Sequence, residues 1–345
     1  MVDFPILHFL FSNNIMNTWE IFGHDWAVEM LQQHVAHQTL RHAYLLTGPA
    51  GVGRRTLALR LAQALNCQTP VAPGVPCRNC RVCKQIEAGQ NIDLMVIQAE
   101  SEGGTLKVEQ VREVQKFLSL KPYQSPYKTV IFLRFQEANA NAQNALLKTL
   151  EEAPSYGILL LTADNAEQLL PTIVSRCEIL RLRPLLVQAV NEFLLARGLD
   201  ADQARLLAHL SGGRPGYALR LSGDKKALDF RVEKLDDLVR LLAAKRRERF
   251  SYAEKLAKDK DGFRQTLLIW LSYWRDVLLR TSGAQAALTN ADRANEIESL
   301  ADQVDLSLAR RVTEALEKAI ERLEKNINAR LLAEVMLMDW PKILR

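Results

Sequence analysis

The sequence predicts an α/β P-loop domain, with a parallel sheet covered by helices on both faces, followed by two helical domains. Short apolar strands alternate with helices over the first half of the chain, which is the pattern of a parallel sheet. A glycine-rich segment joins the first predicted strand to the helix after it. Beyond Pro184 the pattern predicts helices alone.

The strands and helices of the α/β domain follow from short apolar runs and from helical periodicity. Strands are predicted over residues 43–47, 93–98, 129–133 and 158–162. Helices are predicted over residues 26–38, 54–66, 108–118 and 138–152. Because the strands are short, apolar and separated by helices, we expect them to be parallel and buried.

The chain beyond Pro184 is predicted to consist of successive helices. A helix over residues 186–197 ends at Gly198, Asp200 with Gln203 resembles a capping box, and a turn over 211–216 leads into another helix. Two later helices each carry apolar residues on one face: Phe263, Leu267, Trp270 and Trp274 in one, and Leu308, Val312, Leu316, Ala319 and Leu323 in the other. The aromatic face fits either a core or a seam that contacts a partner.

Composition and length bound the class of protein. With 345 residues, the chain is long enough for about two or three domains, and 48% hydrophobic and 25% charged residues are ordinary for a globular protein. The net charge of +5 permits DNA contact without indicating a dedicated nucleic-acid binder. No apolar run reaches the roughly 18 residues that cross a bilayer, so no membrane partner is expected.

Residues 1–18 are predicted to be a tail outside the folded domains. Their apolar stretch over 5–11 follows an acid, Asp3, where a signal peptide has basic residues, and no small-residue cleavage site comes after it. A loose tail and a start at Met16 both fit this pattern. A targeting segment is the remaining alternative.

The glycine loop departs from a working P-loop at two positions. A working loop has the pattern G-x-x-x-x-G-K-[ST], in which lysine reaches the phosphates and the hydroxyl binds magnesium. The sequence has the glycines, but two arginines follow: Gly48, Gly51, Gly53, Arg54 and Arg55. Arginine keeps the charge but replaces a compact ammonium with a planar fork, and the second arginine removes the hydroxyl.

The strand over 129–133 lacks the second part of a nucleotide hydrolase. Such an enzyme places an acid on the magnesium shell at the end of this strand, and here Leu133 and Arg134 occupy the expected positions. Since two independent catalytic parts are missing from one pocket, we expect the fold to be kept and hydrolysis lost. ATP binding in this chain is expected to be absent or unproductive.

Four cysteines in an insertion over residues 67–83 predict a structural zinc site. Cys67, Cys77, Cys80 and Cys83 have the spacing C-x9-C-x2-C-x2-C. Four thiolates complete a tetrahedron around zinc without an open position, and such clusters are typical of the reducing cytoplasm. Cys177 stands apart and is predicted to be a small buried hydrophobe.

The ordered set of motifs resembles the AAA+ clamp-loader family of bacteria. The resemblance covers about residues 19–220 and rests on the four cysteines and on residues 42–48, 144–152, 161–163 and 171–177. It implies an AAA+ domain over 19–183, a small helical lid domain over 184–224, and a C-terminal helical collar over 225–345 through which subunits oligomerise.

The same resemblance implies roles for individual residues. Arg176, in the triplet Ser-Arg-Cys, is similar to an arginine finger that acts in trans on a neighbour's ATP. Thr162 lies at the sensor-1 position, and Arg214 resembles the sensor-2 arginine. Motor subunits of the family carry Lys-Thr in the loop and Asp-Glu after the strand. Their absence here implies a subunit without intrinsic activity.

The expected function is therefore that of a non-hydrolysing clamp-loader subunit in a DNA-directed DNA polymerase holoenzyme, acting in the cytoplasm. Its implied partners are motor subunits of the gamma or tau type, a delta subunit, the sliding clamp and, through the complex, primed DNA. Two alternatives stay open from sequence: an active AAA+ motor with a variant P-loop, and a zinc-dependent DNA-binding module.

Overall fold

The computed structural model describes residues 18–101, 103–325 and 327–343. Residues 1–17 of the predicted tail therefore lie outside the described residues. The described chain divides into two compact units, of which the first runs to Phe193 and includes Gly213–Tyr217. The second comprises Leu194–Gly212 and the residues from Ala218 onward. The predicted boundaries at 183 and 224 are finer than this division and stay predictions.

The first unit is built on a five-stranded parallel sheet with the strand order β2-β3-β4-β1-β5. The strands are β1 (Ala43–Thr47), β2 (Leu94–Ile97), β3 (Lys128–Phe132), β4 (Gly157–Ala163) and β5 (Glu178–Arg181). The central strands β1, β3 and β4 are buried along their whole length, as the apolar runs predict. Four strands thus lie where they are expected from sequence.

The strand β5 was not predicted. It pairs with β1 at the edge of the sheet, where Tyr44 is aligned with Glu178 and Thr47 with Arg181. Only Leu180 is fully buried in this strand, and two of its four residues are charged. An edge strand is buried on one side only, so its sequence lacks the continuous apolar run that marks the inner strands.

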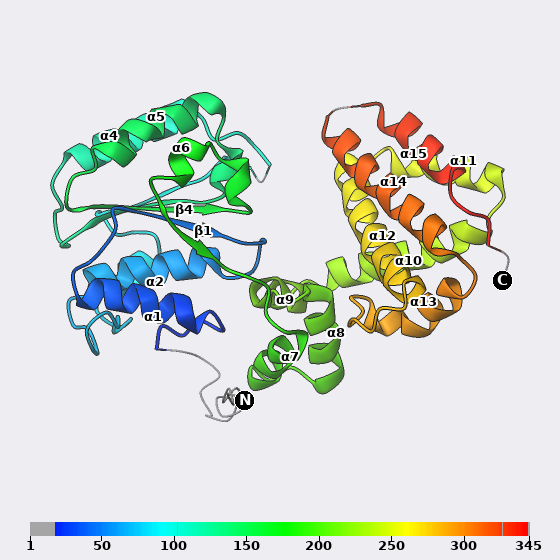
Figure 1. Cartoon of the computed structure of the whole chain (residues 1–345), viewed down its shortest axis with the longest axis horizontal. Helices are drawn as coiled ribbons and strands as arrows, with labels where there is room; N and C mark the ends of the chain where they lie inside the picture. The colour runs from blue at the N-terminus through cyan, green and yellow to red at the C-terminus, as the bar shows by residue number, and fades with distance from the viewer. Residues whose placement is uncertain (1–17, 102, 326, 344–345) are drawn as a thin grey trace, which may run out of the picture. The chain divides into compact units, whose positions relative to one another are not determined.

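Helices cover both faces of the sheet (Figure 1). One face packs against α1 and α2, and the other against α4 and α5, with a separate apolar core on each side. The helices of this region are α1 (Asp25–Ala36), α2 (Arg54–Asn66), α3 (Arg81–Glu87), α4 (Val108–Ser119), α5 (Ala140–Glu151) and α6 (Pro171–Val174), with short turns η1 (Phe135–Glu137) and η2 (Ala166–Gln168). The predicted α/β fold class is confirmed.

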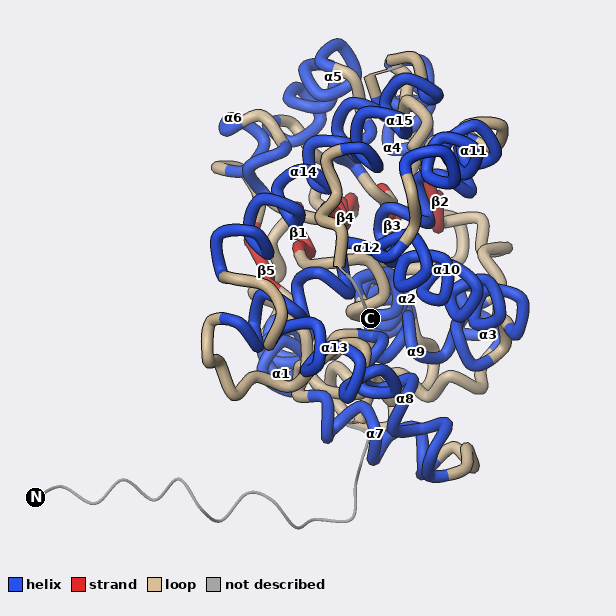
Figure 2. The backbone as a smooth tube through the Cα atoms, turned by 90° about the vertical axis from the view of Figure 1, so that its right-hand side faces the viewer, coloured by secondary structure: helices blue, strands red, loops and turns tan. Residues whose placement is uncertain are grey.

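The rest of the chain is helical, and the strands drawn red in Figure 2 all belong to the first unit. Its elements are α7 (Val187–Ala196), α8 (Ala201–Ser211), α9 (Pro215–Ser222), α10 (Lys225–Ala243), α11 (Arg246–Leu256), α12 (Lys260–Thr281), η3 (Ala291–Arg293), α13 (Ala294–Ala301), α14 (Leu306–Glu324) and α15 (Ala329–Met338). As predicted, Asp200 caps α8 by accepting from Gln203 N. Among the described residues, no helix has both the length and the apolar content to span a bilayer.

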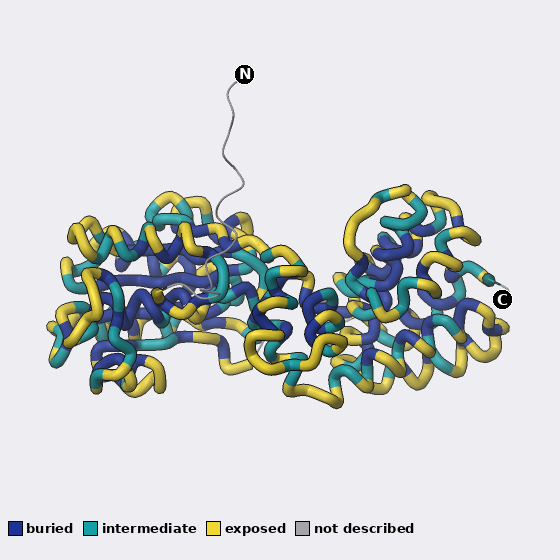
Figure 3. The backbone as a smooth tube through the Cα atoms, turned by 90° about the horizontal axis from the view of Figure 1, so that it is seen from below, coloured by how far each residue is buried: buried dark blue, intermediate teal, exposed yellow. Residues whose placement is uncertain are grey.

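The aromatic face of α12 belongs to the core of the second unit. Phe263, Leu267, Trp270 and Trp274 are each fully buried, together with the inner face of α14. In Figure 3 the buried residues follow the strands and the inward sides of the helices. This face was expected to form either a core or a seam with a partner, and in the structure it is core. The Trp270 indole is satisfied there, since its Nε1 donates to Lys234 O at 2.7 Å.

Candidate nucleotide pocket, arginine turn and metal centre

The glycine loop between β1 and α2 keeps the backbone of a phosphate-binding loop. Gly48, Gly51 and Gly53 have φ angles of 140°, 86° and 119°, a region that side chains other than glycine rarely adopt. A Cβ added at Gly48 would lie only 2.1 Å from Leu182 O. The three glycines are therefore required by the path of the chain, whether or not a nucleotide binds.

The loop is tied to the unit that surrounds it. Gly48 N donates to Ala163 O and Asp164 O, at 3.3 and 3.1 Å, and Gly51 O accepts from Gly216 N at 2.9 Å. His24 Nε2 donates to Val52 O at 3.1 Å. Burial lowers the pKa of His24, so its ring is neutral near pH 7 and supplies this N–H without a charge. These bonds fix the loop from both of its sides.

Arg54 takes the place of the P-loop lysine and turns its charge inward. Its side chain is buried, and Nη2 lies 2.7 Å from Oδ1 of Asp164, which follows β4. Burial lowers the pKa of Arg54, Asp164 opposes that shift, and the positive Arg134 adds to it. The cation at this position is thus already paired within the chain. Arg55 and Thr56 are exposed at the start of α2.

The end of β3 carries a cation where a hydrolase has an acid. Arg134 adopts a left-handed conformation, with φ 52° and ψ 53°, and its N–H donates to Thr162 Oγ1 at 2.9 Å. Its Nε lies 2.8 Å from Glu137 Oε1, so the nearest acid along the chain is engaged by this arginine. The sensor-like Thr162 is buried and supports the strand end through its hydroxyl.

The sensor-like Arg214 comes to the same region through the start of α9. A Cβ on Gly51 would meet the backbone N of Tyr217 at 2.8 Å, so the first turn of α9 lies directly on the glycine loop. The Arg214 guanidinium carbon lies 4.5 Å from the centre of the Tyr217 ring. Arg214 thus precedes the residues that contact the glycine loop, while Thr162 supports the end of β3 through its bond to Arg134 N.

Arg176 lies in a turn between α6 and β5, and none of its hydrogen bonds reaches the glycine loop. Its Nη1 donates to Thr172 O at 2.8 Å, and its Nη2 lies 2.6 Å from Glu151 Oε1. The side chain is 35% exposed. The next residue, Cys177, packs against the apolar core, and burial raises the pKa of its thiol to about 12. Cys177 thus anchors the turn while Arg176 faces outward.

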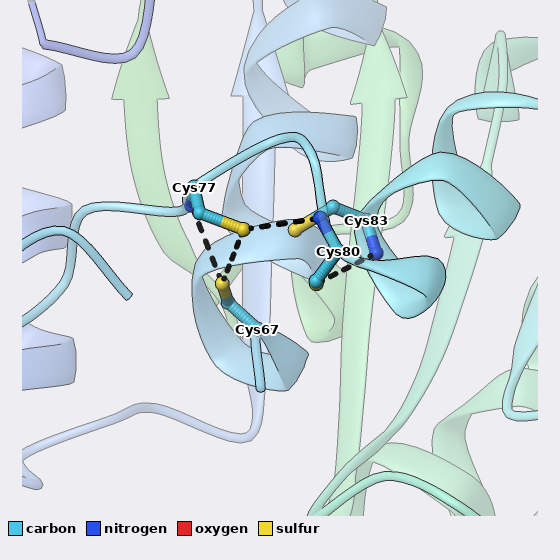
Figure 4. A group of neighbouring side chains, drawn as sticks. All are labelled: Cys67, Cys77, Cys80 and Cys83. Carbon is cyan, nitrogen blue, oxygen red and sulfur yellow. Dashed lines mark hydrogen bonds between the residues drawn. The ribbon is translucent and has the colours of Figure 1, made fainter. Parts of the chain in front are cut away.

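The four predicted cysteines come together in space (Figure 4). Cys67 follows the last residue of α2, Cys80 precedes α3, and Cys83 lies in its first turn. The four sulfur atoms all lie within 4.8 Å of one another. For Zn–S bonds of about 2.3 Å, a tetrahedron has sulfurs roughly 3.8 Å apart. The donor set and its spacing therefore fit a metal ion of the zinc type.

Backbone and hydroxyl groups prepare the cluster for thiolates. The N–H groups of Cys77, Cys80 and Cys83 point at the sulfurs of Cys67, Cys77 and Cys80, with N···S distances of 3.3, 3.3 and 3.4 Å. Hydrogen bonds from the Thr69 hydroxyl and the Cys80 amide lower the pKa of Cys77 to about 6, whereas burial raises the pKa of Cys67 and of Cys83. Such donors stabilise the charged sulfur that binds a metal.

A polar network that the sequence did not reveal ties this insertion to α2. Buried Arg60 forms an ion pair with Glu87 at the end of α3, and Gln63 Nε2 donates to Cys83 O at 2.9 Å. Arg60 Nε donates to Trp19 O, and Trp19 Nε1 donates to Gly74 O at 2.9 Å. The available sequence signal was the polar pair Arg60 and Gln63 among the apolar residues in the second half of α2.

Comparison with known proteins places this geometry in a family. Residues 23–186 match the family model described as DNA polymerase III, delta subunit, and residues 226–342 match the one described as its C-terminal part. The DNA polymerase III subunit delta' of Pseudomonas aeruginosa is 33% identical over 310 residues, which are 88% of this chain and 92% of that protein. The chain belongs to the delta-prime family of DNA polymerase III subunits.

Two further relatives bear on this assignment. The Bacillus subtilis delta-prime subunit is 30% identical over 90% of this chain and 94% of its own length. The Bacillus subtilis protein named DNA polymerase III subunit tau is 27% identical over 92% of this chain and 60% of its own length. The tau protein thus matches this chain over most of the chain's length, although the chain spans only 60% of that protein.

Proposed function

We propose that this delta-prime family member is a non-hydrolysing subunit of the DNA polymerase III clamp loader. It supplies Arg176 to ATP held by a neighbouring motor subunit of the gamma or tau type. Its other partners are a delta subunit, the sliding clamp and, through the complex, primed DNA in the cytoplasm. The proposed domains are those expected from sequence: an AAA+ domain over 19–183, a lid over 184–224 and a collar over 225–345.

One observation supports the absence of hydrolysis: Arg54 and Arg134, which stand where a hydrolase has its lysine and its acid, are each in an ion pair within the chain. Arg54 contacts Asp164 at 2.7 Å, and Arg134 contacts Glu137 at 2.8 Å. A phosphate would have to compete with these carboxylates, and magnesium would meet guanidinium groups where it needs an acid and a hydroxyl. The pocket then serves as a rigid element that positions the rest of the subunit.

The turn that bears Arg176 supports its role toward another subunit. The side chain is partly exposed, and within the described residues Thr172 O and Glu151 accept from two of its five N–H donors. An arginine supplied in trans stabilises the charge that develops on a transferring γ-phosphate. A partly exposed guanidinium whose two terminal nitrogens each keep a second N–H is suited to that task.

The four-cysteine centre is proposed to hold structural zinc. Cys67, Cys77, Cys80 and Cys83 would occupy all positions of a tetrahedral ion, so none remains for water or substrate. Zinc bound there would cross-link the insertion to the end of α2. The residues of this chain then do no chemistry at the metal.

The substitution Arg176→Ala tests the proposed finger. In a loader reconstituted with its motor and delta subunits, clamp and primed DNA, we expect turnover at the dependent ATP site to fall by about 10³-fold or more. The total ATPase rate of the complex should then fall by the amount that this one site contributes. The side chain is surface-exposed, so folding and complex assembly should be unchanged.

The control for this experiment is Arg183→Ala, which removes an exposed arginine close by in the sequence. Its complex should turn over ATP at the wild-type rate. A wild-type rate for the Arg176→Ala complex, with the variant incorporated in full, would rule out the finger role.

The isolated chain is predicted to have no magnesium-dependent ATPase activity. Purified protein incubated with Mg-ATP should release phosphate no faster than the variant Arg54→Ala, because magnesium lacks its protein ligands in this pocket. Phosphate release by a sensitive coupled assay is the measurement. Robust turnover that disappears in Arg54→Ala would instead establish an active motor with a variant loop.

A further inference from the structure

The guanidinium of Arg176 is held from two directions by two different elements. Thr172 O, in α6, accepts from Nη1 at 2.8 Å. Glu151, the last residue of α5, places Oε1 2.6 Å from Nη2. The Arg176 backbone is fixed as well, since its N–H donates to Ile173 O at 3.1 Å. A flexible four-carbon side chain is thereby confined to one direction.

Stability does not account for the acid at position 151. A carboxylate at the C-terminus of a helix lies at the negative end of the helix dipole, which is unfavourable. Glu151 and Arg176 are 52% and 35% exposed, and ion pairs so open to water add little stability. The two effects nearly cancel, so the net benefit of this pair must lie elsewhere.

We infer that Glu151 is a positioning residue for the arginine finger. This inference rests on the proposed role of Arg176 and adds a second residue to it. Thr172 O and Glu151 each take one N–H, on Nη1 and Nη2 respectively, and the other N–H groups of the guanidinium would contact phosphate oxygens of a neighbour's ATP. An arginine ordered before the partner arrives loses less rotamer freedom when it binds.

The chain contains a matched control at the next position. Glu152 has the same side chain and lies at the C-cap of α5, where its N–H donates to Lys148 O at 3.0 Å. Like Glu151 it is exposed, but its carboxylate forms no ion pair within the described part of the chain. A general effect of negative charge at this helix end would therefore appear in variants of both residues.

The experiment measures the ATPase rate of the reconstituted complex with Glu151→Ala, Glu151→Gln and Glu152→Ala, each alone and with Arg176→Ala. We define the Arg176-dependent part of kcat as the difference in kcat between the wild-type complex and the Arg176→Ala complex. We expect Glu151→Ala to lower that part about tenfold, since a misplaced group loses its catalytic advantage. The KM for ATP and the melting temperature should not change.

The glutamine variant and the double variant separate positioning from a structural role. Glu151→Gln keeps an oxygen that accepts from Nη2 and should retain most of the rate, and Glu152→Ala should retain all of it. In the Arg176→Ala background, Glu151→Ala should have no further effect, because both changes act through one guanidinium.

Three results would overturn the inference while leaving the finger in place: a wild-type rate for Glu151→Ala, a faster rate, or an effect additive with Arg176→Ala. A faster rate would mean that the carboxylate restrains the arginine instead of presenting it. If Arg176→Ala alone has no effect on the ATPase rate, the proposed function itself is wrong. The Arg176→Ala measurement therefore separates a failure of the proposed function from a failure of this inference.

Discussion

Removal of the metal from the four-cysteine centre is expected to unfold the insertion and to destabilise the first unit strongly. Structural zinc sites bind with about 10–16 kcal/mol in small peptides, and a whole domain is stable by only about 5–15 kcal/mol. The segment from Cys67 to Cys83 has few buried apolar residues of its own, so a metal bound there would be its main cross-link.

The unfolding should spread beyond the insertion through the network on α2. Arg60 and Gln63 bond to Glu87 and Cys83 O, and the Trp19 indole N–H donates to Gly74 O. Loss of these partners leaves buried polar groups unsatisfied, at about 1–3 kcal/mol each. We therefore expect the tryptophan fluorescence of the protein to change as the metal is removed, and this change to be lost in Trp19→Phe.

The measurement is urea unfolding of the protein with bound zinc, with chelator added, and with Cys80→Ser. Metal content determined by atomic emission should be one zinc per chain and near zero in Cys80→Ser. Cys177→Ala serves as the control, since this cysteine packs away from the cluster and should leave zinc content unchanged. Equal unfolding midpoints with and without chelator would contradict a structural role for the metal.

Most of the fold could be predicted from local patterns in the sequence. The continuous apolar runs of β1, β3 and β4 arise because these strands are buried on both faces, and the cysteine spacing follows from a metal site closed by short loops. The missed strand β5 is an edge strand with charged ends, which has neither signal. The face of α12 could be assigned to the core only once its neighbours were known.

The partners of the site residues could not be predicted, because each contact joins elements far apart in the chain. Sequence shows that Arg54 replaces a lysine, but not that Asp164 after β4 neutralises it. It shows that Arg134 replaces an acid, but not that Thr162 supports its backbone. An acid at the carboxyl end of a parallel strand was the available signal for Asp164, since that edge also carries the glycine loop.

Arg249 is the clearest case of a residue whose importance only the structure reveals. It lies in α11, is buried, and donates all five of its guanidinium N–H groups to backbone carbonyls. The acceptors are Leu241 O, Leu242 O, Leu337 O, Trp340 O and Pro341 O, at distances of 2.7–3.2 Å. These carbonyls belong to the ends of α10 and α15, so one cation closes two helix C-termini.

Replacing this residue by methionine, Arg249→Met, is expected to lower the free energy of unfolding of the second unit by about 4 kcal/mol or more. Methionine fills similar apolar space but removes five hydrogen bonds from a charged donor, and such bonds contribute about 1.5–3 kcal/mol each. Leu241 O and Leu242 O would keep one backbone donor each, from Ala244 N and Ile343 N. Burial lowers the pKa of Arg249, yet the negative ends of two helix dipoles favour its charged form.

Urea denaturation followed by circular dichroism would measure this loss, with Arg247→Met as the matched control. Arg247 lies two residues earlier in α11 and is exposed. The free energy of unfolding of Arg247→Met should therefore lie within about 0.5 kcal/mol of the wild-type value. Arg249→Lys should fall between the two, because an ammonium has three donors and cannot reach both helix ends with a planar fork. A loss below about 1 kcal/mol for Arg249→Met would mean that water satisfies these carbonyls, and that α10 and α15 are joined by apolar packing alone.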